Sequence, residues 1–90
     1  MKKNTKNRTP TNGDLLKRIT IQPDVLVGKP TIRGMRISVE QILHLLSEGI
    51  STKEILHEFP VLEEEDIRAA VAYAHRMLST EKVYRAGISS

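Results

Sequence analysis

The sequence predicts a mainly α-helical fold in which three helices follow a few short β-strands. Two observations support this prediction. Between residues 38 and 78, apolar side chains recur at helical spacing in three segments, and the first two segments start at a serine suited to capping a helix. Residues 18–37 instead combine β-branched residues with prolines and glycines, as short strands and turns do.

The length of 90 residues allows one domain. Residues 1–13 hold four cations and one apolar residue, Met1, and this composition cannot bury enough surface to offset the chain entropy. We expect a disordered basic tail at residues 1–13, a single helix-turn-helix domain with an N-terminal β-hairpin at 14–84, and a flexible tail at 85–90. So small a domain has modest stability, which favours a homodimer or a higher oligomer.

The strands are expected ahead of the helices. Residues 18–21 alternate polar and apolar side chains and predict a short strand, and the proline and aspartate at 23–24 predict a turn. Residues 31–32 and 36–37 predict the arms of a small hairpin about residues 33–34.

Two helices with a short connection are predicted next. The first, over residues 38–48, opens with a serine and a glutamine in a capping-box pattern, and Gly49 ends it. Ser51 and Glu54 repeat the capping pattern, and Pro60 prevents the second helix from continuing. Two helices joined by a turn at Gly49 match a helix-turn-helix arrangement.

The third and longest helix is predicted over residues 64–78. The acidic residues 63–66 suit the positive end of its helix dipole. Glu63 stands at the cap position, where Ser, Thr or Asp would be a stronger cap. The apolar stripe expected to face the core comprises Ile67, Ala70, Val71, Ala74, Met77 and Leu78.

Charge is distributed unevenly along the chain. Residues 1–36 contain nine Lys or Arg and two Asp (net +7), whereas residues 37–90 contain five Lys or Arg and nine Asp or Glu (net −4). The basic half is suited to an anionic partner. The chain has no cysteine for a thiolate metal site and no apolar run long enough to span a bilayer, so we expect a soluble cytoplasmic protein.

The motifs of several enzyme classes are absent. The segment GKPTIRGMRIS at residues 28–38 lacks the GxxxxGK[S/T] spacing of a phosphate-binding loop. His44, His57 and His75 lack the four-residue spacing of a zinc-binding helix, and we interpret each as a surface side chain. The acids at 63–66 lack the spacing of a calcium loop. We therefore expect no enzyme, no catalytic residue, no metal and no cofactor.

Cations in two places are candidates for nucleic-acid contacts. Lys29, Arg33 and Arg36 lie in or beside the predicted hairpin, and Arg68 and Arg76 lie on the third helix. In helix-turn-helix proteins a later helix enters the major groove, and cations around it contact phosphates. The four carboxylates that open the third helix would oppose such binding. In the alternative, structural interpretation the hairpin arginines pair with acids or stay in water.

The motifs GKPTIRGMRI (residues 28–37), SxxEILxxFPxL (51–62) and DIRAA (66–70) resemble, in order and spacing, the small bacterial family catalogued as domain of unknown function 433. The resemblance covers residues 17–76 and implies a homeodomain-like three-helix fold with no catalytic residues. The chain departs from the family pattern at three positions: Met35 replaces the usual Thr, Val27 a common Gly, and Glu63 a Thr that would cap the third helix.

The resemblance implies that members are antitoxins, often encoded beside a toxin with a PIN-like ribonuclease fold. We therefore expect an antitoxin-like component of a type II toxin–antitoxin system that neutralises such a toxin and can also bind operator DNA. The acidic half suits a partner with a cationic RNA-binding cleft, and the expected partner contacts are Glu63, Glu64, Glu65 and Asp66. Two alternatives stay open: a DNA-binding regulator without a toxin, and a protein-interaction domain with no role on nucleic acid.

Overall fold

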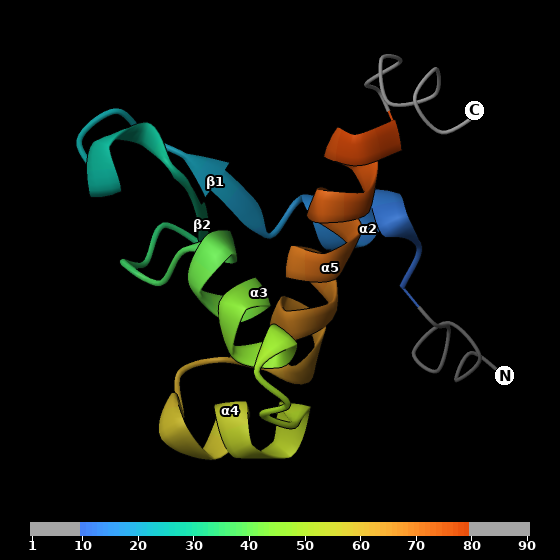
Figure 1. The fold of residues 1–90 in the computed structure, drawn as a ribbon. Coiled ribbons are helices and arrows are strands. Elements are labelled where there is room, and N and C mark those ends of the chain that lie inside the picture. Colours follow the sequence, from blue (N-terminus) through green and yellow to red (C-terminus); the bar gives the residue numbers. More distant parts are fainter. Residues whose placement is uncertain (1–9, 80–90) are drawn as a thin grey trace, which may run out of the picture.

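The computed structural model describes residues 10–79 of the chain. In order, the elements are helix α2 (Asn12–Leu16), strand β1 (Ile19–Ile21), a helical turn (Leu26–Gly28), strand β2 (Pro30–Ile32) and helices α3 (Val39–Ser47), α4 (Thr52–Glu58) and α5 (Glu64–Ser79). The mainly helical fold with short strands ahead of three helices is confirmed (Figure 1). Helix α2 is an element that the sequence interpretation missed.

Helix α2 starts inside the segment expected to be disordered. Thr11 and Asp14 form a complete capping box, in which each side chain accepts the other residue's backbone N–H at 3.1 Å. Leu15 then packs against Ala69 and Ala72 of α5. The ordered domain therefore begins before residue 14, because a local cap and an apolar contact outweigh the polar composition. The remaining predicted tail residues, 1–9 and 85–90, lie outside the described residues, as do residues 80–84 of the predicted domain.

Strands β1 and β2 form an antiparallel two-stranded sheet. Their register pairs Ile19 with Ile32, Thr20 with Thr31 and Ile21 with Pro30. The strand predicted at residues 18–21 is confirmed, but the partner of β2 in the sheet is β1, not residues 36–37. The sheet therefore ties the segment that follows α2 to the segment that precedes α3.

A tight turn follows β2. Met35 N–H donates to Ile32 O at 2.8 Å, and Arg33 and Gly34 between them have left-handed backbones, with φ of 46° and 73°. Two consecutive positive φ angles are typical of the turns that reverse a hairpin. The predicted reversal at residues 33–34 is thus confirmed, although its arms are joined by a single bridge, between Thr31 and Ser38.

The turn between the strands is also left-handed. The φ angles of Leu26, Val27 and Gly28 are 47°, 55° and 77°. A residue with a side chain is strained in this region by about 1–2 kcal/mol, and Val27 is 91% exposed, so packing does not offset the strain. The departure from glycine at residue 27 therefore has a structural cost.

The predicted N-cap serines of α3 and α4 are confirmed, but the capping box predicted for Ser38 and Gln41 is only half present, because the Gln41 side chain makes no bond back to Ser38. Ser38 accepts the N–H that starts α3, and Ser51 starts α4 within a complete capping box. Gly49, with φ of 87°, ends α3, and Ile50 N–H donates to Leu45 O at 3.1 Å, which is the bond of a Schellman motif. These local signals explain why the helix boundaries could be predicted closely.

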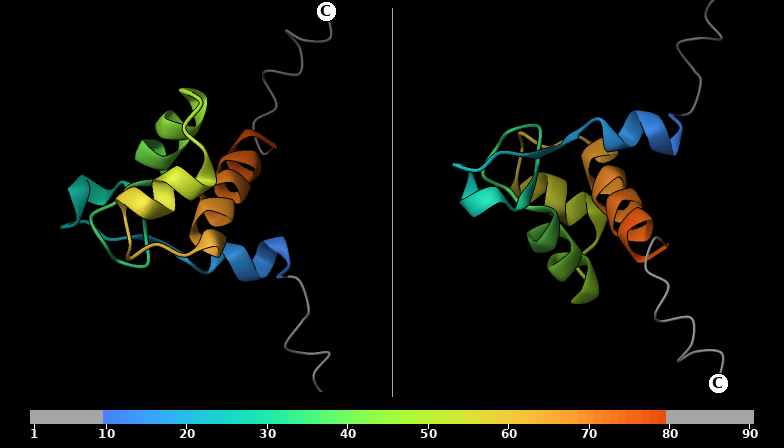
Figure 2. Two further views of the ribbon diagram at one scale, coloured as in Figure 1. Left: turned by 90° about the horizontal axis from the view of Figure 1, so that it is seen from below. Right: turned by 90° about the horizontal axis from the view of Figure 1, so that it is seen from above.

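Helix α5 lies in the middle of the domain. Helices α3 and α2 contact it on different sides, α4 contacts it near its start, and β1 also contacts it (Figures 1 and 2). The main core contains Ile32, Val39, Ile42, Ile55, Leu62, Ile67 and Ala70. A smaller apolar cluster joins α2 to α5.

The contact with α2 changes which residues of α5 are buried. Ala69 and Ala72 are buried against α2, whereas Val71, Met77 and Leu78 are exposed. The prediction that these last three face the core is wrong. A stripe defined by one helical face overlooks a helix that is covered on two sides, and α2 was not predicted.

Candidate functional site

An ionic cluster joins the sheet to the start of α5. The register that places Ile19 opposite Ile32 also places Arg18 opposite Arg33, one step beyond the ladder, and Arg33 N–H donates to Arg18 O at 2.7 Å. Two cations facing each other would repel. The carboxylate of Asp66, from the first turn of α5, bonds to both and so makes this arrangement possible.

The side chain of Asp66 is fully buried and both of its oxygens are bonded. Arg33 donates to it from Nε at 3.1 Å and from Nη2 at 2.8 Å, and Arg18 Nη1 donates at 2.9 Å. Glu63 N–H also donates to Asp66, at 2.8 Å. Asp66 therefore supplies the helix-start bond that Glu63, a weak cap residue, does not provide. Arg18 Nη1 in addition contacts Glu63 Oε1 at 2.8 Å.

The pKa values in the cluster favour the ionised forms. Burial alone would raise the pKa of Asp66, but hydrogen bonds from Arg33, from the Glu63 backbone and from Arg18 outweigh it, so the pKa of Asp66 lies below its ordinary value. Hydrogen bonds to Glu63 and Asp66 raise the pKa of Arg18, and the bond to Asp66 raises the pKa of Arg33. The cluster is an interlocked set of charges that stabilises the fold.

The cluster takes up three of the residues predicted to contact partners. Arg33 is bound to Asp66 and to Val61 O at 2.9 Å, so the structural interpretation of this hairpin arginine holds. Asp66 has no exposed surface with which to contact a partner, so it is no longer a candidate for partner binding. Glu63 remains 57% exposed while paired to Arg18.

The other predicted contact residues do not gather in one place. Lys29 Nζ pairs with Glu40 Oε1 at 3.0 Å on the surface. Arg36 lies on the loop after β2, and Arg68 and Arg76 lie on two different parts of α5. Within residues 10–79, the side chains of these three arginines are exposed and make no ion pair or hydrogen bond. Of the acidic run, Glu64 is exposed and Glu65 is half-buried.

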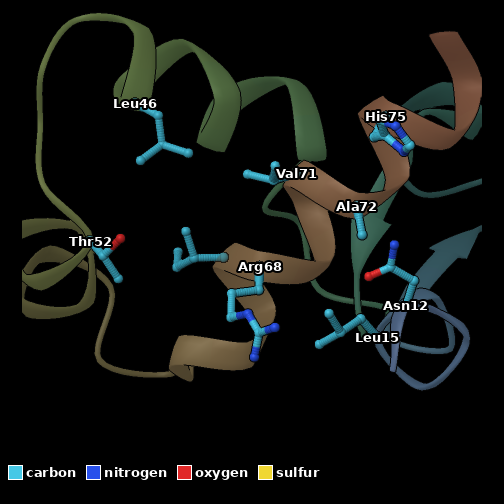
Figure 3. A pocket seen from close by; sticks show the side chains of 9 residues that line it. Asn12, Leu15, Leu46, Thr52, Arg68, Val71, Ala72 and His75 are labelled. Atoms are coloured by element: carbon cyan, nitrogen blue, oxygen red, sulfur yellow. The ribbon is translucent and has the colours of Figure 1, made fainter. Parts of the chain in front are cut away.

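A hollow of about 620 Å³ lies along α5, between α2 and the facing ends of α3 and α4. We call it the α5 groove. Its apolar side chains are Leu15, Leu46, Ile67, Val71 and Ala72, and its polar ones are Asn12, Thr52, Arg68 and His75. Val71 and Leu46 point toward each other across it (Figure 3). No sequence motif indicated this surface, because it depends on α2 and on the position of Val71.

The comparisons with known proteins agree with the resemblance noted in the sequence. Residues 19–74 match the sequence profile of the family described as "Protein of unknown function (DUF433)". The chain belongs to this family. The matched region of this DUF433 protein runs from β1 into α5 and contains Arg33, Glu63 and Asp66, whereas α2 and His75 lie outside it.

One relative of this DUF433 protein is the "Uncharacterized protein y4eO" from Sinorhizobium fredii (strain NBRC 101917 / NGR234). The two are 38% identical over 56 residues, which cover 62% of this chain and 25% of the relative. The chain thus spans about a quarter of the length of that relative. No solved structure is significantly similar to the chain.

Three further findings bear on the DUF433 domain's chemistry. Across residues 10–79, no group of three or more His, Cys, Asp or Glu side chains is placed to hold a metal ion. In the same part of the chain, no helix has both the length and the apolar character needed to cross a membrane. The three histidines lie apart. His44 Nε2 is 3.4 Å from Glu48 Oε2, His57 is exposed on α4, and His75 lines the α5 groove.

Proposed function

We propose that this DUF433 protein is an antitoxin-like interaction domain that binds and neutralises a PIN-like ribonuclease toxin in the cytoplasm. The observation that supports protein binding is the α5 groove, where Val71 is 47% exposed and Leu46 is half-buried, over the buried Leu15, Ile67 and Ala72. These two side chains give a partner protein an apolar surface to pack on, inside a hollow formed by three other helices and α5. The nuclease as partner follows from the family resemblance.

The acidic first turn of α5 gives the partner a second contact. Glu64 and Glu65, with the exposed part of Glu63, present carboxylates that suit the cationic cleft of an RNA-cleaving enzyme. Asp66 takes no part, because it is inside the fold. The double change Glu64→Gln and Glu65→Gln is therefore the clean test of this contact, since it spares the ionic cluster.

The test begins with the gene beside this one. Its product is co-expressed with the 90-residue chain and purified through a tag on that product. We expect the chain to co-purify and to abolish the product's ribonuclease activity at equimolar ratio. The Glu64→Gln, Glu65→Gln variant should bind more weakly at low salt and nearly equally at high salt. A neighbouring product that shows no ribonuclease activity, or whose activity the chain leaves unchanged, would refute the proposal.

Operator binding is the second candidate function, and we propose it for a homodimer. Its support is that Arg36 and Arg68 are exposed without an acidic partner among the described residues. A labelled duplex from upstream of the gene is titrated at about 50 and 200 mM salt, where phosphate contacts weaken affinity steeply. Arg36→Ala should reduce the salt slope by about one. Affinity that does not respond to salt would exclude this role, and sedimentation of the free chain tests the dimer.

A further inference from the structure

The α5 groove combines two accessible apolar side chains, Val71 and the half-buried Leu46, with two polar side chains of α5 at a fixed spacing. Arg68 and His75 are seven residues apart on one helix, so they lie on nearly the same face and about 10 Å apart along its axis. Val71 and Ala72 stand between them on that face. Leu46 of α3 and Thr52 of α4 flank this face on one side, and Leu15 and Asn12 of α2 flank it on the other (Figure 3).

Among residues 10–79, the side chains of Arg68 and His75 have no hydrogen-bond acceptor. The side chain of Arg68 makes no ion pair or hydrogen bond within residues 10–79, although Glu64 precedes it by one turn. Of the nearby acids, Asp66 is bound inside the fold and Glu63 is bound to Arg18, whereas Glu64 and Glu65, four and three residues before Arg68, make no bond to it. A guanidinium offers only donors, and an imidazole N–H adds another. A carboxylate supplied by an occupant is the matching group for each.

Other occupants fit the groove less well. A small-molecule site encloses most of its ligand and holds a few convergent polar groups, whereas Val71 is 47% exposed here and the polar groups stand at the rim. A nucleic acid would meet a single arginine and no Phe, Tyr or Trp side chain in the groove.

A second copy of the chain is also disfavoured. A two-fold axis perpendicular to α5 would pair the two copies of α5 in antiparallel directions, and an axis along α5 would pair them in parallel. With Val71 and Ala72 at the centre, Arg68 of one copy would face His75 of the other in the antiparallel pair and Arg68 in the parallel pair, so donors would face donors in both. The arrangement thus favours an occupant of different sequence.

We propose that the α5 groove binds an amphipathic helix of a partner protein, which carries an apolar stripe flanked by two carboxylates about two helical turns apart. The apolar stripe packs on Val71 and Leu46, as in helix-in-groove recognition. One carboxylate accepts from Arg68 and the other from His75. The inference rests on the proposed function only in that the occupant is a protein, and it does not depend on that protein's being a nuclease.

A peptide selection tests the charge rule without knowledge of the partner. Phage-displayed libraries of helical peptides are selected against the full 90-residue chain, against Arg68→Glu, and against Arg36→Glu as a matched control away from the groove. We expect the wild type and Arg36→Glu to enrich peptides with an apolar stripe and acids about seven residues apart. Selection against Arg68→Glu should enrich peptides that carry Lys or Arg at the position opposite residue 68. Enriched sets without that acidic preference, or no enrichment, would overturn the proposal.

A binding measurement then locates the site. One selected peptide and its Glu→Lys counterpart are titrated by fluorescence anisotropy. Val71→Asp should weaken binding of the acidic peptide at least about tenfold, as loss of a central contact does, whereas Val61→Asp, an exposed valine outside the groove, should not. Circular dichroism confirms that each variant is folded, and Val71→Ser replaces Val71→Asp if the latter is not. Unchanged binding by a folded Val71 variant would overturn the proposal.

The remaining outcomes separate this inference from the proposed function. Sedimentation showing self-association that Val71→Asp abolishes would overturn the helix proposal in favour of a second copy. A ribonuclease that binds the wild type and the folded Val71→Asp variant equally would support the antitoxin function and refute the groove as its site. Peptide binding in the groove without any ribonuclease partner would support the groove and refute the antitoxin function.

Discussion

Two regions of α5 lie within about one turn of each other, and they differ in whether their charged side chains are bonded within the fold. At Asp66 the helix directs a charge into the fold, where two arginines and a backbone N–H bond to it. At Arg68 and Val71 the same helix leaves a charge without an acidic partner among the described residues and a valine half exposed. The first region satisfies its polar groups internally, and the second leaves groups for another molecule to satisfy. The difference shows that the charge of a segment does not reveal whether it serves the fold or a partner.

The largest effect should come from Asp66→Ala. The change leaves Arg18 and Arg33 facing each other and removes the bond to Glu63 N–H, so we expect the free energy of unfolding to fall by about 3 kcal/mol. Urea denaturation followed by circular dichroism measures it. Glu64→Ala, in the same helical turn but exposed, should cost about 0.5 kcal/mol. If the free energy of unfolding fell by similar amounts in the two variants, the buried acid would contribute no more to stability than the exposed one.

The arginines of the hairpin provide the next comparison. Arg33→Ala removes three hydrogen bonds, two to Asp66 and one to Val61 O, and should cost about 2 kcal/mol. Arg36→Ala, three residues along the same loop, should change stability by no more than about 0.5 kcal/mol. A double-mutant cycle between residues 33 and 66 should show a coupling energy, and none is expected between residues 36 and 66.

Acid titration gives a smaller effect with a defined sign. The pKa of Asp66 is lower in the fold than in the unfolded chain, where it is about 3.9. Between the two values the unfolded state binds more protons, so stability falls as the pH falls. The stability from ionised Asp66 is therefore complete above about pH 5 and is lost below about pH 4 as the pH approaches the folded pKa.

Melting temperatures across this range test the assignment. The difference between the wild type and Asp66→Asn should shrink as the solution is acidified. Both proteins should keep some acid sensitivity, because hydrogen bonds from the Ser51 backbone and side chain lower the pKa of Glu54. A constant difference from neutral pH into acid would mean that Asp66 does not stabilise the fold through its charge.

The parts of the fold that could be predicted from the sequence are those with local causes. The caps at Ser38 and Ser51 and the stop at Gly49 each depend on residues within about two turns, and the structure has them in place. The missed helix α2 also has a local signal, the pair Thr11 and Asp14, but the polar composition around it outweighed that signal in the interpretation. Local chemistry therefore carried more information than composition.

The ionic cluster and the groove could not be predicted in this way. Arg33 and Asp66 are 33 residues apart, and their contact depends on the β1–β2 register together with the packing of α5. The only local hint was an aspartate three residues after a weak cap. Val71 was assigned to the core because the periodic pattern describes one face, and α2 covers a second one. The candidate site thus follows from tertiary contacts, whereas the helices follow from neighbouring residues.

The smallest effect is expected for Val71, and it best distinguishes the region of α5 that serves the fold from the region that serves a partner. Val71→Ala should change the free energy of unfolding by no more than about 0.5 kcal/mol, because alanine's better helix propensity offsets the little apolar burial that is lost. Ile67→Ala, one turn earlier and buried in the core, should cost about 3 kcal/mol in the same urea titration. A residue that contributes nothing to folding but is needed for binding the acidic peptide belongs to an interface. A loss at Val71 that approaches the loss at Ile67 would instead make Val71 part of the core, and α5 would then have no region reserved for a partner.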